Sequence, residues 1–186
     1  MSGSLPGFLI DIARIPAVAV GLPITIGALV GYSTDTQTAW YSSLKQPPGN
    51  PPSWVYGPVW TILYGMMGYA SHLVSEVAVK NVDSATSETA KGALGLYYAQ
   101  LVLNFAWMPL FFTAKSPFVA LADIVTVTST VFVMTDVMNA LPTRIRTIYL
   151  LAPYCGWLVY ATYLNAGVCF LNKDHKADRK SKPKGE

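Results

Sequence analysis

The sequence is poor in charged residues and in cysteine. Only 12% of its 186 residues are Asp, Glu, Lys or Arg, about half of the roughly 25% that is usual in soluble domains. Hydrophobic residues make up 52%. This composition excludes a disordered chain, a disulfide scaffold and a highly charged nucleic-acid binder. The two cysteines, Cys155 and Cys169, are too far apart along one apolar stretch to form a disulfide within a helix.

Several signatures of common chemistry are also absent. The chain has no G-x-G-x-x-G, P-loop, H-E-x-x-H or G-x-S-x-G motif, so we expect neither a standard catalytic centre nor a required cofactor. His72 has only Glu76 at ligand spacing on its own helix, which predicts no metal site. The first residues, Met1 to Phe8, lack the basic start of a secretory signal, and we expect no cleaved leader.

What the sequence does contain is long apolar stretches. A bilayer core of about 30 Å needs roughly 20 apolar residues per helix. The pattern predicts an all-α integral membrane bundle of five transmembrane helices in a single domain, residues 1–172, followed by a basic polar tail, residues 173–186. Asp11 and Arg14, one turn apart, are expected to pair or to reach the membrane interface. The predicted spans lie near residues 8–31, 54–79, 92–113, 118–138 and 147–171.

A long proline-rich loop is predicted between the first two spans, from Tyr32 to Ser53. Its run Pro47-Pro48-Gly49-Asn50-Pro51-Pro52 cannot be helical, because each proline removes a donor and restricts the residue before it. The other connections are short, which predicts antiparallel neighbours. They are Lys80–Lys91, Ala114–Pro117 and Asn139–Arg146.

Basic residues are unevenly divided between the two ends of such a bundle. With five spans, eight share the end that carries the tail, four lie at the other end, and Arg14 lies within the first predicted span. The positive-inside bias then predicts a cytoplasmic C-terminus, with membrane lipid as a partner of the chain. The first set is Lys45, Lys115, Lys173, Lys176, Arg179, Lys180, Lys182 and Lys184, and the second is Lys80, Lys91, Arg144 and Arg146.

Aromatic residues recur at helical spacing on three of the predicted spans. Each of these faces offers one tryptophan with small or amide neighbours. Such faces would either wall a pocket for a flat, mostly apolar ligand or pack between helices, and spacing alone leaves both open. The faces are Trp60, Tyr64, Met67 and Ser71; Asn104, Trp107 and Phe111; and Trp157, Ala161, Leu164 and Asn165.

Polar residues within the spans need partners, because an unsatisfied amide is costly in hydrocarbon. We therefore predict hydrogen bonds between helices for Gln100, Asn104 and Asn165. Asp123 either has a function or lies at the interface. Small residues four apart, Gly27 with Gly31 and Gly95 with Ala99, favour close helix approach within the bundle or in a homodimer.

Three ordered blocks of the sequence resemble the TspO/MBR family, which includes the translocator proteins and the bacterial tryptophan-rich sensory proteins. The blocks are Trp40-Tyr41-x-x-Leu44 with Pro51-Pro52-x-Trp54-x-x-x-Pro58-Val59-Trp60-x-x-Leu63-Tyr64, then Gln100-Leu101-x-Leu103-Asn104-x-x-Trp107, then Pro153-Tyr154-x-x-Trp157-x-x-x-Ala161-Thr162-x-Leu164-Asn165.

The resemblance implies a five-helix membrane receptor or translocator, often dimeric, that binds porphyrins such as haem as ligands, as well as sterols and other lipophilic molecules. It also implies an alternative: a slow, light- and oxygen-dependent breakdown of porphyrin in which Trp60 and Trp157 would be the catalytic residues. The ligand-binding residues that it implies are Tyr56, Gly57, Val59, Trp60, Asn104, Trp107, Ala122, Thr126, Trp157, Ala161 and Leu164.

One departure from the family affects the expected ligand. The cholesterol motif of animal members requires a tyrosine near the end of the last helix, but the stretch from Leu164 to Lys173 contains none. Porphyrin binding is therefore expected more firmly than sterol binding. The resemblance also implies the mitochondrial outer membrane for a eukaryotic chain, with a plant-type secretory membrane or a bacterial envelope as the alternatives.

Overall fold

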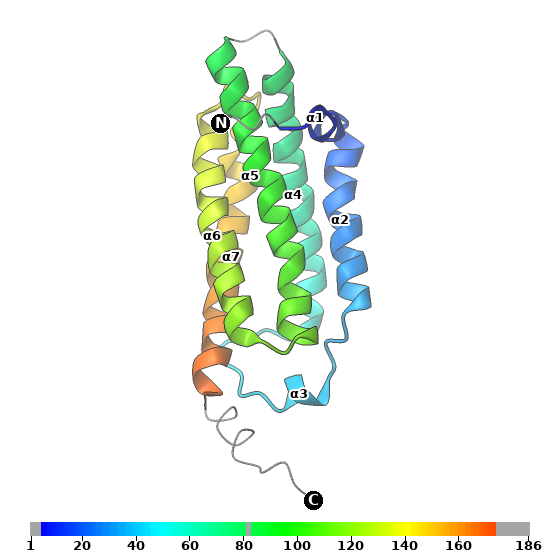
Figure 1. Ribbon diagram of the computed structural model, residues 1–186, viewed down its shortest axis with the longest axis vertical. Helices are drawn as coiled ribbons and strands as arrows, with labels where there is room; N and C mark the ends of the chain where they lie inside the picture. The colour runs from blue at the N-terminus through cyan, green and yellow to red at the C-terminus, as the bar shows by residue number, and fades with distance from the viewer. Residues whose placement is uncertain (1–4, 81–82, 174–186) are drawn as a thin grey trace, which may run out of the picture.

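The computed structural model describes residues 5–80 and 83–173, and these residues form helices and no strands (Figure 1). The predicted all-α class is confirmed. Five long helices lie side by side along the long axis, while α1 lies at one end of the bundle and α3 at the other. The elements are α1 (Gly7–Arg14), α2 (Pro16–Ser33), α3 (Ala39–Ser42), α4 (Ser53–Val79), α5 (Ser84–Met108), the π-helix η1 (Pro109–Thr113), α6 (Pro117–Ala140) and α7 (Ile148–Leu171).

Among the described residues, three helical segments are long and apolar enough to cross a membrane. They are Pro16–Ser33, Ser84–Thr113 and Pro117–Ala140. The helices α4 and α7 are similarly long, with 27 and 24 residues.

The predicted first span, residues 8–31, is wrong at its beginning. The chain leaves the helical conformation at Ile15, which has φ −90° and ψ 107°, and a new helix begins at Pro16. A proline disfavours the α conformation of the residue before it, which accounts for the break. Asp11 and Arg14 therefore belong to the short α1, where Arg14 Nη1 lies 3.5 Å from Asp11 Oδ1, as predicted for this pair.

The third long helix also differs from its prediction, because α5 begins at Ser84 rather than near residue 92. Asp83 caps this helix: its carboxylate accepts hydrogen bonds from the Thr86 backbone N–H at 2.9 Å and from the Thr86 hydroxyl at 2.7 Å. An aspartate at the N-cap satisfies an otherwise free backbone donor. The polar stretch predicted as a loop up to Lys91 is thus mostly the first two turns of α5.

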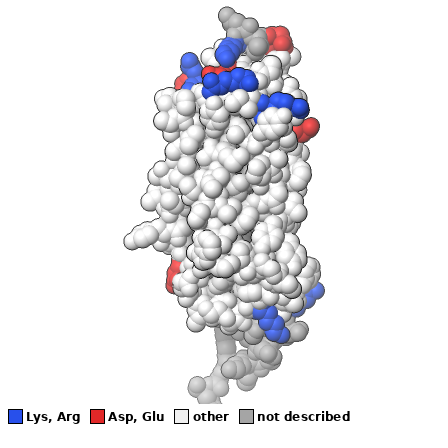
Figure 2. All heavy atoms as spheres, turned by 180° about the vertical axis from the view of Figure 1, so that it is seen from behind, with Lys and Arg blue, Asp and Glu red and all other residues white. Residues whose placement is uncertain are grey.

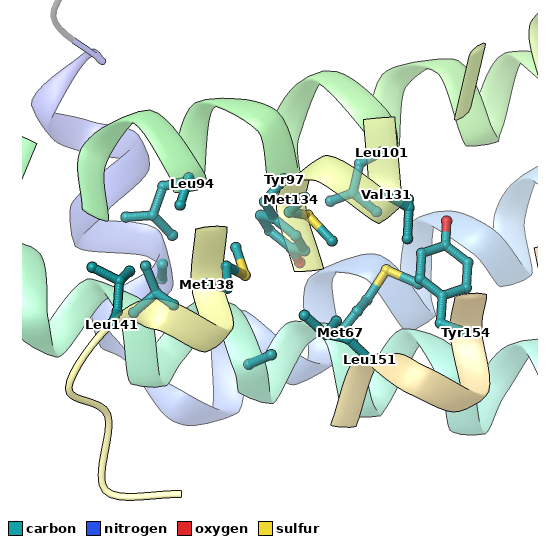
Figure 3. Close-up of a cluster of buried hydrophobic side chains, with 14 of the residues drawn as sticks. Met67, Leu94, Tyr97, Leu101, Val131, Met134, Met138, Leu141, Leu151 and Tyr154 are labelled. Carbon is teal, nitrogen blue, oxygen red and sulfur yellow. The ribbon is translucent and has the colours of Figure 1, made fainter. Parts of the chain in front are cut away.

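The core lies between α4, α5, α6 and α7, where Figure 3 shows side chains from these helices meeting. Met67, Met134 and Met138 are fully buried there, next to Leu94. Within a bilayer, lipid tails are as apolar as these side chains, so helix association depends on close packing rather than on exclusion of water. Flexible methionines fill the irregular gaps in such an interface.

Helices α2 and α4 approach each other closely at two glycines. A side chain at Gly68 would collide with the Ala19 carbonyl, and one at Gly27 would collide with the Tyr64 ring. A Cβ at Gly31 would meet nothing within 4 Å, and one at Gly95 would meet only a Leu5 methyl group at 3.9 Å. Of the two small-residue pairs, only Gly27 therefore supports tight packing within the bundle.

The two ends of the molecule are distinct. The described N-terminal segment, the end of α4 and the beginning of α5 lie at one end, and α3 and the end of α7 lie at the other. Figure 2 shows that, on the face it presents, charged residues gather toward the ends with an uncharged surface between them. Of the predicted tail, residues 174–186 lie outside the described residues.

Candidate functional site

Two tryptophans from different helices face each other at the centre of an aromatic cluster. The rings of Trp60 on α4 and Trp157 on α7 lie 6.4 Å apart, centroid to centroid, at an interplanar angle of 88°. Trp60 also contacts Tyr64 at 5.3 Å and Tyr154 at 6.1 Å, and Tyr56 contacts Trp157 at 6.0 Å. We call these five residues the paired-tryptophan cluster.

The helical spacing explains why these rings meet. Tyr56, Trp60 and Tyr64 follow one another four residues apart on α4, so they form a stripe on one face of that helix. Tyr154 and Trp157 are three residues apart on α7 and share a face in the same way. Because α4 and α7 pack against each other, the two stripes come into contact.

A chain of buried hydrogen bonds connects this cluster to α5. The Tyr64 hydroxyl donates to Asn104 Oδ1 at 2.6 Å, and Asn104 Nδ2 donates to the Tyr154 hydroxyl at 3.0 Å. The Tyr154 hydroxyl in turn donates to Gln100 Oε1 at 2.7 Å, and Gln100 Nε2 lies 3.5 Å from Met67 Sδ. The predicted hydrogen bonds between helices are confirmed for Gln100 and Asn104. Both amides thus contact side chains on neighbouring helices.

The indole N–H of Trp157 is not part of this hydrogen-bonded chain. Trp157 Nε1 is buried and has no hydrogen-bond partner among the described residues. A buried donor without a partner costs about 1–3 kcal/mol relative to a paired one. The atom is therefore positioned to donate to an acceptor that the chain itself does not supply.

The third predicted tryptophan of the site belongs to a different cluster. Trp107, at the end of α5, stacks on Phe111 of η1 at 5.0 Å, and Trp40 of α3 contacts the same phenyl ring at 5.8 Å. Its indole N–H donates to Asn165 Oδ1 at 2.9 Å, while Asn165 Nδ2 donates to the Pro117 carbonyl at 3.0 Å. The hydrogen bonding predicted for Asn165 is thus confirmed. We call this group the Trp107 cluster, with Trp40, Tyr41, Trp107, Phe111 and Phe112 as members.

The remaining predicted residues divide into three groups. On α4 and α7, Val59 and Ala161 are partly buried and Leu164 is buried. Gly57 is exposed, and a Cβ there would meet nothing within 4 Å. Ala122 and Thr126 are both exposed on α6, where the Thr126 hydroxyl donates to the Ala122 carbonyl at 2.8 Å. The structure thus leaves Gly57 and the two α6 residues exposed.

The proline-rich segment lies against α7 beside the paired-tryptophan cluster. The Tyr160 hydroxyl donates to the Gly49 carbonyl at 2.6 Å, and the Tyr163 hydroxyl donates to the Pro48 carbonyl at 3.0 Å. Asn50 Oδ1 accepts from the Tyr56 hydroxyl at 3.0 Å. The backbone of this segment is therefore held by two tyrosine hydroxyls of α7, and its Asn50 side chain is held by a tyrosine hydroxyl of α4.

A further contact fixes the beginning of the same segment. Asn172, just after α7, accepts from the Lys45 backbone N–H at 2.9 Å and donates to the Lys45 carbonyl at 3.0 Å. Pro47 also rests on Gly167, where a side chain would collide with its ring. Sequence reasoning did not select Tyr160, Tyr163 or Asn172, because their partners are backbone atoms more than 100 residues away.

Metal chemistry finds no support near His72. The His72 Nδ1 atom donates to the Ala13 carbonyl at 3.1 Å, and its Nε2 lies 3.9 Å from the Glu76 carboxylate. Within residues 5–80 and 83–173, no three His, Cys, Asp or Glu side chains gather as metal ligands would. Asp123 Oδ2 is buried without a partner in the same described part of the chain, so both interpretations of this residue stay open.

Comparison with known proteins identifies the family of the chain. Residues 19–171 match the TspO/MBR family. The chain is 41% identical over 152 residues to a translocator protein homolog of Schizosaccharomyces pombe, covering 81% of this chain and 88% of that relative. It is 38% identical over 154 residues to the human translocator protein, with 81% and 86% covered, and 34% identical over 157 residues to the tryptophan-rich protein TspO of Chlorobaculum tepidum, with 84% and 94% covered. The chain therefore belongs to the TspO/MBR family.

Proposed function

We propose that this membrane protein is a receptor or translocator that binds porphyrins at the paired-tryptophan cluster. The observation that carries the proposal is the Trp157 indole N–H, which is buried beside a second tryptophan and has no hydrogen-bond partner among the described residues. Family membership supports the same role, because the relatives are named translocator and tryptophan-rich proteins. Haem and protoporphyrin are then ligands, and the protein requires no resident cofactor.

The chemistry of the cluster suits a flat, largely apolar ligand with a few acceptor groups. Indole and phenol faces stack against a conjugated macrocycle, and Trp157 Nε1 supplies a donor for a carboxylate or carbonyl oxygen. A hydrogen bond to a charged acceptor contributes about 1.5–3 kcal/mol when it is made in a dry site. The buried amide chain beneath the rings fixes Tyr64 and Tyr154 in place, so this floor is preorganised.

Ligand entry requires movement, since the rings of the cluster contact one another in this structure. A porphyrin must part Trp60 from Trp157 or enter from the open side next to Gly57. The segment held by Tyr56, Tyr160 and Tyr163 lies over this region and must loosen as well. We therefore infer that the proline-rich loop acts as a lid whose opening accompanies binding.

We infer that α2, α4, α5, α6 and α7 all cross the membrane, with η1 continuing α5. Three of these helices have the length and hydropathy of a span on their own, and α4 and α7 pack among them. In this placement the C-terminus is cytoplasmic, in the mitochondrial outer membrane of a eukaryote. A plant secretory membrane and a bacterial envelope remain alternatives. Sterol is a weaker ligand and a homodimer is the proposed assembly.

The test is a titration of the purified protein with protoporphyrin IX in the dark, followed by the porphyrin absorbance band. We expect saturable binding by the natural sequence and affinity lower by about tenfold in Trp157→Phe, since one lost hydrogen bond corresponds to about 1.4 kcal/mol. Trp60→Phe tests the stacking surface in parallel. Trp54→Phe is the matched control, because Trp54 is 74% exposed and outside the cluster. Equal affinity in all four proteins contradicts the site assignment.

A second activity is supported by the contact between two oxidisable indoles. If porphyrin lies beside Trp60 and Trp157, light excitation allows an indole to donate an electron to the excited porphyrin, with dioxygen as the final oxidant. The expected sign is loss of porphyrin absorbance that requires light, oxygen and both indoles. Stable absorbance under illumination, with dark binding intact, rejects this activity and leaves the receptor role.

A further inference from the structure

The end of the bundle where α4 finishes carries an open hollow with both charged and apolar lining. Its walls are formed by Arg14, at the end of α1, and by Glu76, Val79 and Lys80, at the end of α4. Its volume is about 280 Å³, and it is open to its surroundings. That space accommodates a phosphodiester group.

The short helix α1 positions one wall of this hollow. In Figure 1, α1 runs across the end of the bundle rather than along it. Two side chains from the long helices fix it there: His72 Nδ1 donates to the Ala13 carbonyl at 3.1 Å, and the Tyr98 hydroxyl donates to the Leu9 carbonyl at 2.6 Å. Arg14 is thereby held beside Lys80.

The cations of the hollow are only weakly paired within the protein. Arg14 Nη1 lies 3.5 Å from Asp11 Oδ1, and the two side chains are 54% and 70% exposed. Lys80 Nζ lies 3.6 Å from Glu76 Oε2, with Lys80 68% exposed. Exposed pairs of this length contribute little. A guanidinium has five donors, so most of the hydrogen-bonding capacity of Arg14 is left for an external acceptor.

The surroundings favour a lipid rather than a free anion. Val79 forms part of the wall and is 47% exposed, and Phe8 and Ile15, on the same α1 segment as Arg14, are 63% and 55% exposed. Large exposed apolar side chains next to cations match the boundary between acyl chains and headgroups. Figure 2 places charged residues at this end, beyond the uncharged surface.

We propose that this hollow binds the phosphate headgroup of an anionic phospholipid, with Arg14 and Lys80 as its cationic partners. The proposal rests on the membrane placement above but not on porphyrin binding. Arg14 presents parallel N–H donors to two phosphate oxygens, and Lys80 adds a second cation. Glu76 opposes the anion, so the lining residues carry a net charge of +1, from two cations and one carboxylate.

The test compares lipids that differ in headgroup charge. The purified protein is titrated with short-chain phosphatidylglycerol, with short-chain phosphatidylcholine and with inorganic phosphate, and bound species are counted by native mass spectrometry. We expect preference for phosphatidylglycerol in the natural sequence and an affinity lower by about tenfold or more in Arg14→Gln/Lys80→Gln, since charge-assisted hydrogen bonds are the strong ones. Glu76→Gln should raise the affinity several-fold.

The matched control is Lys91→Gln. Lys91 lies at the same end but is paired with Glu88 at 2.6 Å and is not part of the hollow, so its removal should leave the preference unchanged. Equal binding of the two lipids, or an unaltered preference in the double variant, overturns the proposal. Saturable binding of inorganic phosphate at the same affinity overturns its lipid part.

Liposome flotation separates this proposal from the membrane placement. Flotation of both the natural sequence and the double variant with vesicles shows that both are inserted. Loss of the headgroup preference in the double variant then supports the proposal. Failure of the natural sequence to float contradicts the membrane placement instead. Thermal unfolding of the double variant confirms that the bundle is intact.

Discussion

The two aromatic clusters contain the same residue types, but their indole N–H groups differ in hydrogen bonding. In the Trp107 cluster the indole N–H is paired with Asn165, which is itself paired with the Pro117 carbonyl. In the paired-tryptophan cluster the N–H of Trp157 has no partner among the described residues. The comparison teaches that tryptophan content alone does not mark a binding site. An unsatisfied polar atom beside the rings is what distinguishes the proposed site from the Trp107 cluster.

The Trp107 cluster also explains how α3, which precedes the proline-rich segment, is anchored. Trp40 and Tyr41 of α3 rest on Phe111, and Phe111 belongs to the π-helix η1. Pro109 lacks a backbone donor, which favours the wider turn at this point. The widened turn brings Phe111 and Phe112 to the side where α3 lies. The ring contacts of this cluster join α3, α5 and η1.

The largest effect is expected from Trp107→Ala. Loss of the ring removes the stacking on Phe111 and leaves Asn165 without its donor, so the unfolding free energy should fall by about 3–5 kcal/mol. Thermal unfolding in detergent measures this change. Porphyrin affinity of the protein that remains folded should be unaltered. A variant of natural stability with weakened binding would reverse the roles of the two clusters.

Two conservative variants test the contribution of the indole N–H group in each cluster. Trp107→Phe and Trp157→Phe each replace an indole with a phenyl ring. Only the first substitution breaks a hydrogen bond. We expect Trp107→Phe to be the less stable of the two by about 1–3 kcal/mol, the cost of a buried group left unpaired. Thermal unfolding of both variants side by side tests this. Equal melting temperatures would mean that the Trp107 to Asn165 bond contributes nothing.

A smaller effect is expected at the contact between Asn172 and Lys45. Asn172→Ala removes both hydrogen bonds to Lys45 and should lower stability by about 1 kcal/mol. Its clearer consequences are faster porphyrin exchange and faster proteolytic cleavage within residues 43–52. Lys173→Ala is the control, because Lys173 contacts Phe170 and not the loop. Unchanged exchange in Asn172→Ala would show that this contact does not control entry.

The smallest effect is expected at Asp83, which lies outside both aromatic clusters. Hydrogen bonds from Thr86 hold the pKa of Asp83 below its ordinary value. A folded-state pKa that is lowered means that the cap stabilises the protein above the unfolded pKa of about 3.9, and that this contribution is lost as the pH falls through that region. Asp83→Asn should flatten this pH dependence slightly in thermal unfolding. A changed porphyrin affinity would contradict its independence from the clusters.

The sequence alone determined the helical class, the approximate positions of the long helices and the family. Apolar runs of about 20 residues and the ordered blocks around Trp60, Trp107 and Trp157 were sufficient, because they are local patterns. The partner amides Gln100, Asn104 and Asn165 were also predictable as a class, since a polar group at that depth requires a hydrogen bond. The beginnings of α2 and α5 were missed, although Ile15 before Pro16 and Asp83 before Ser84 are local signals too.

Which tryptophans come into contact depends on the packing of the helices. Helical spacing places Trp60, Trp107 and Trp157 each on one face, but it does not give the rotation of each helix against its neighbours. Packing of α4 on α7 brings Trp60 to Trp157, whereas η1 and α3 draw Trp107 into a separate cluster. Ala122 and Thr126 lie on an exposed face for the same reason. Distances between side chains on different helices depend on how whole helices pack, and one helix's sequence does not contain that information.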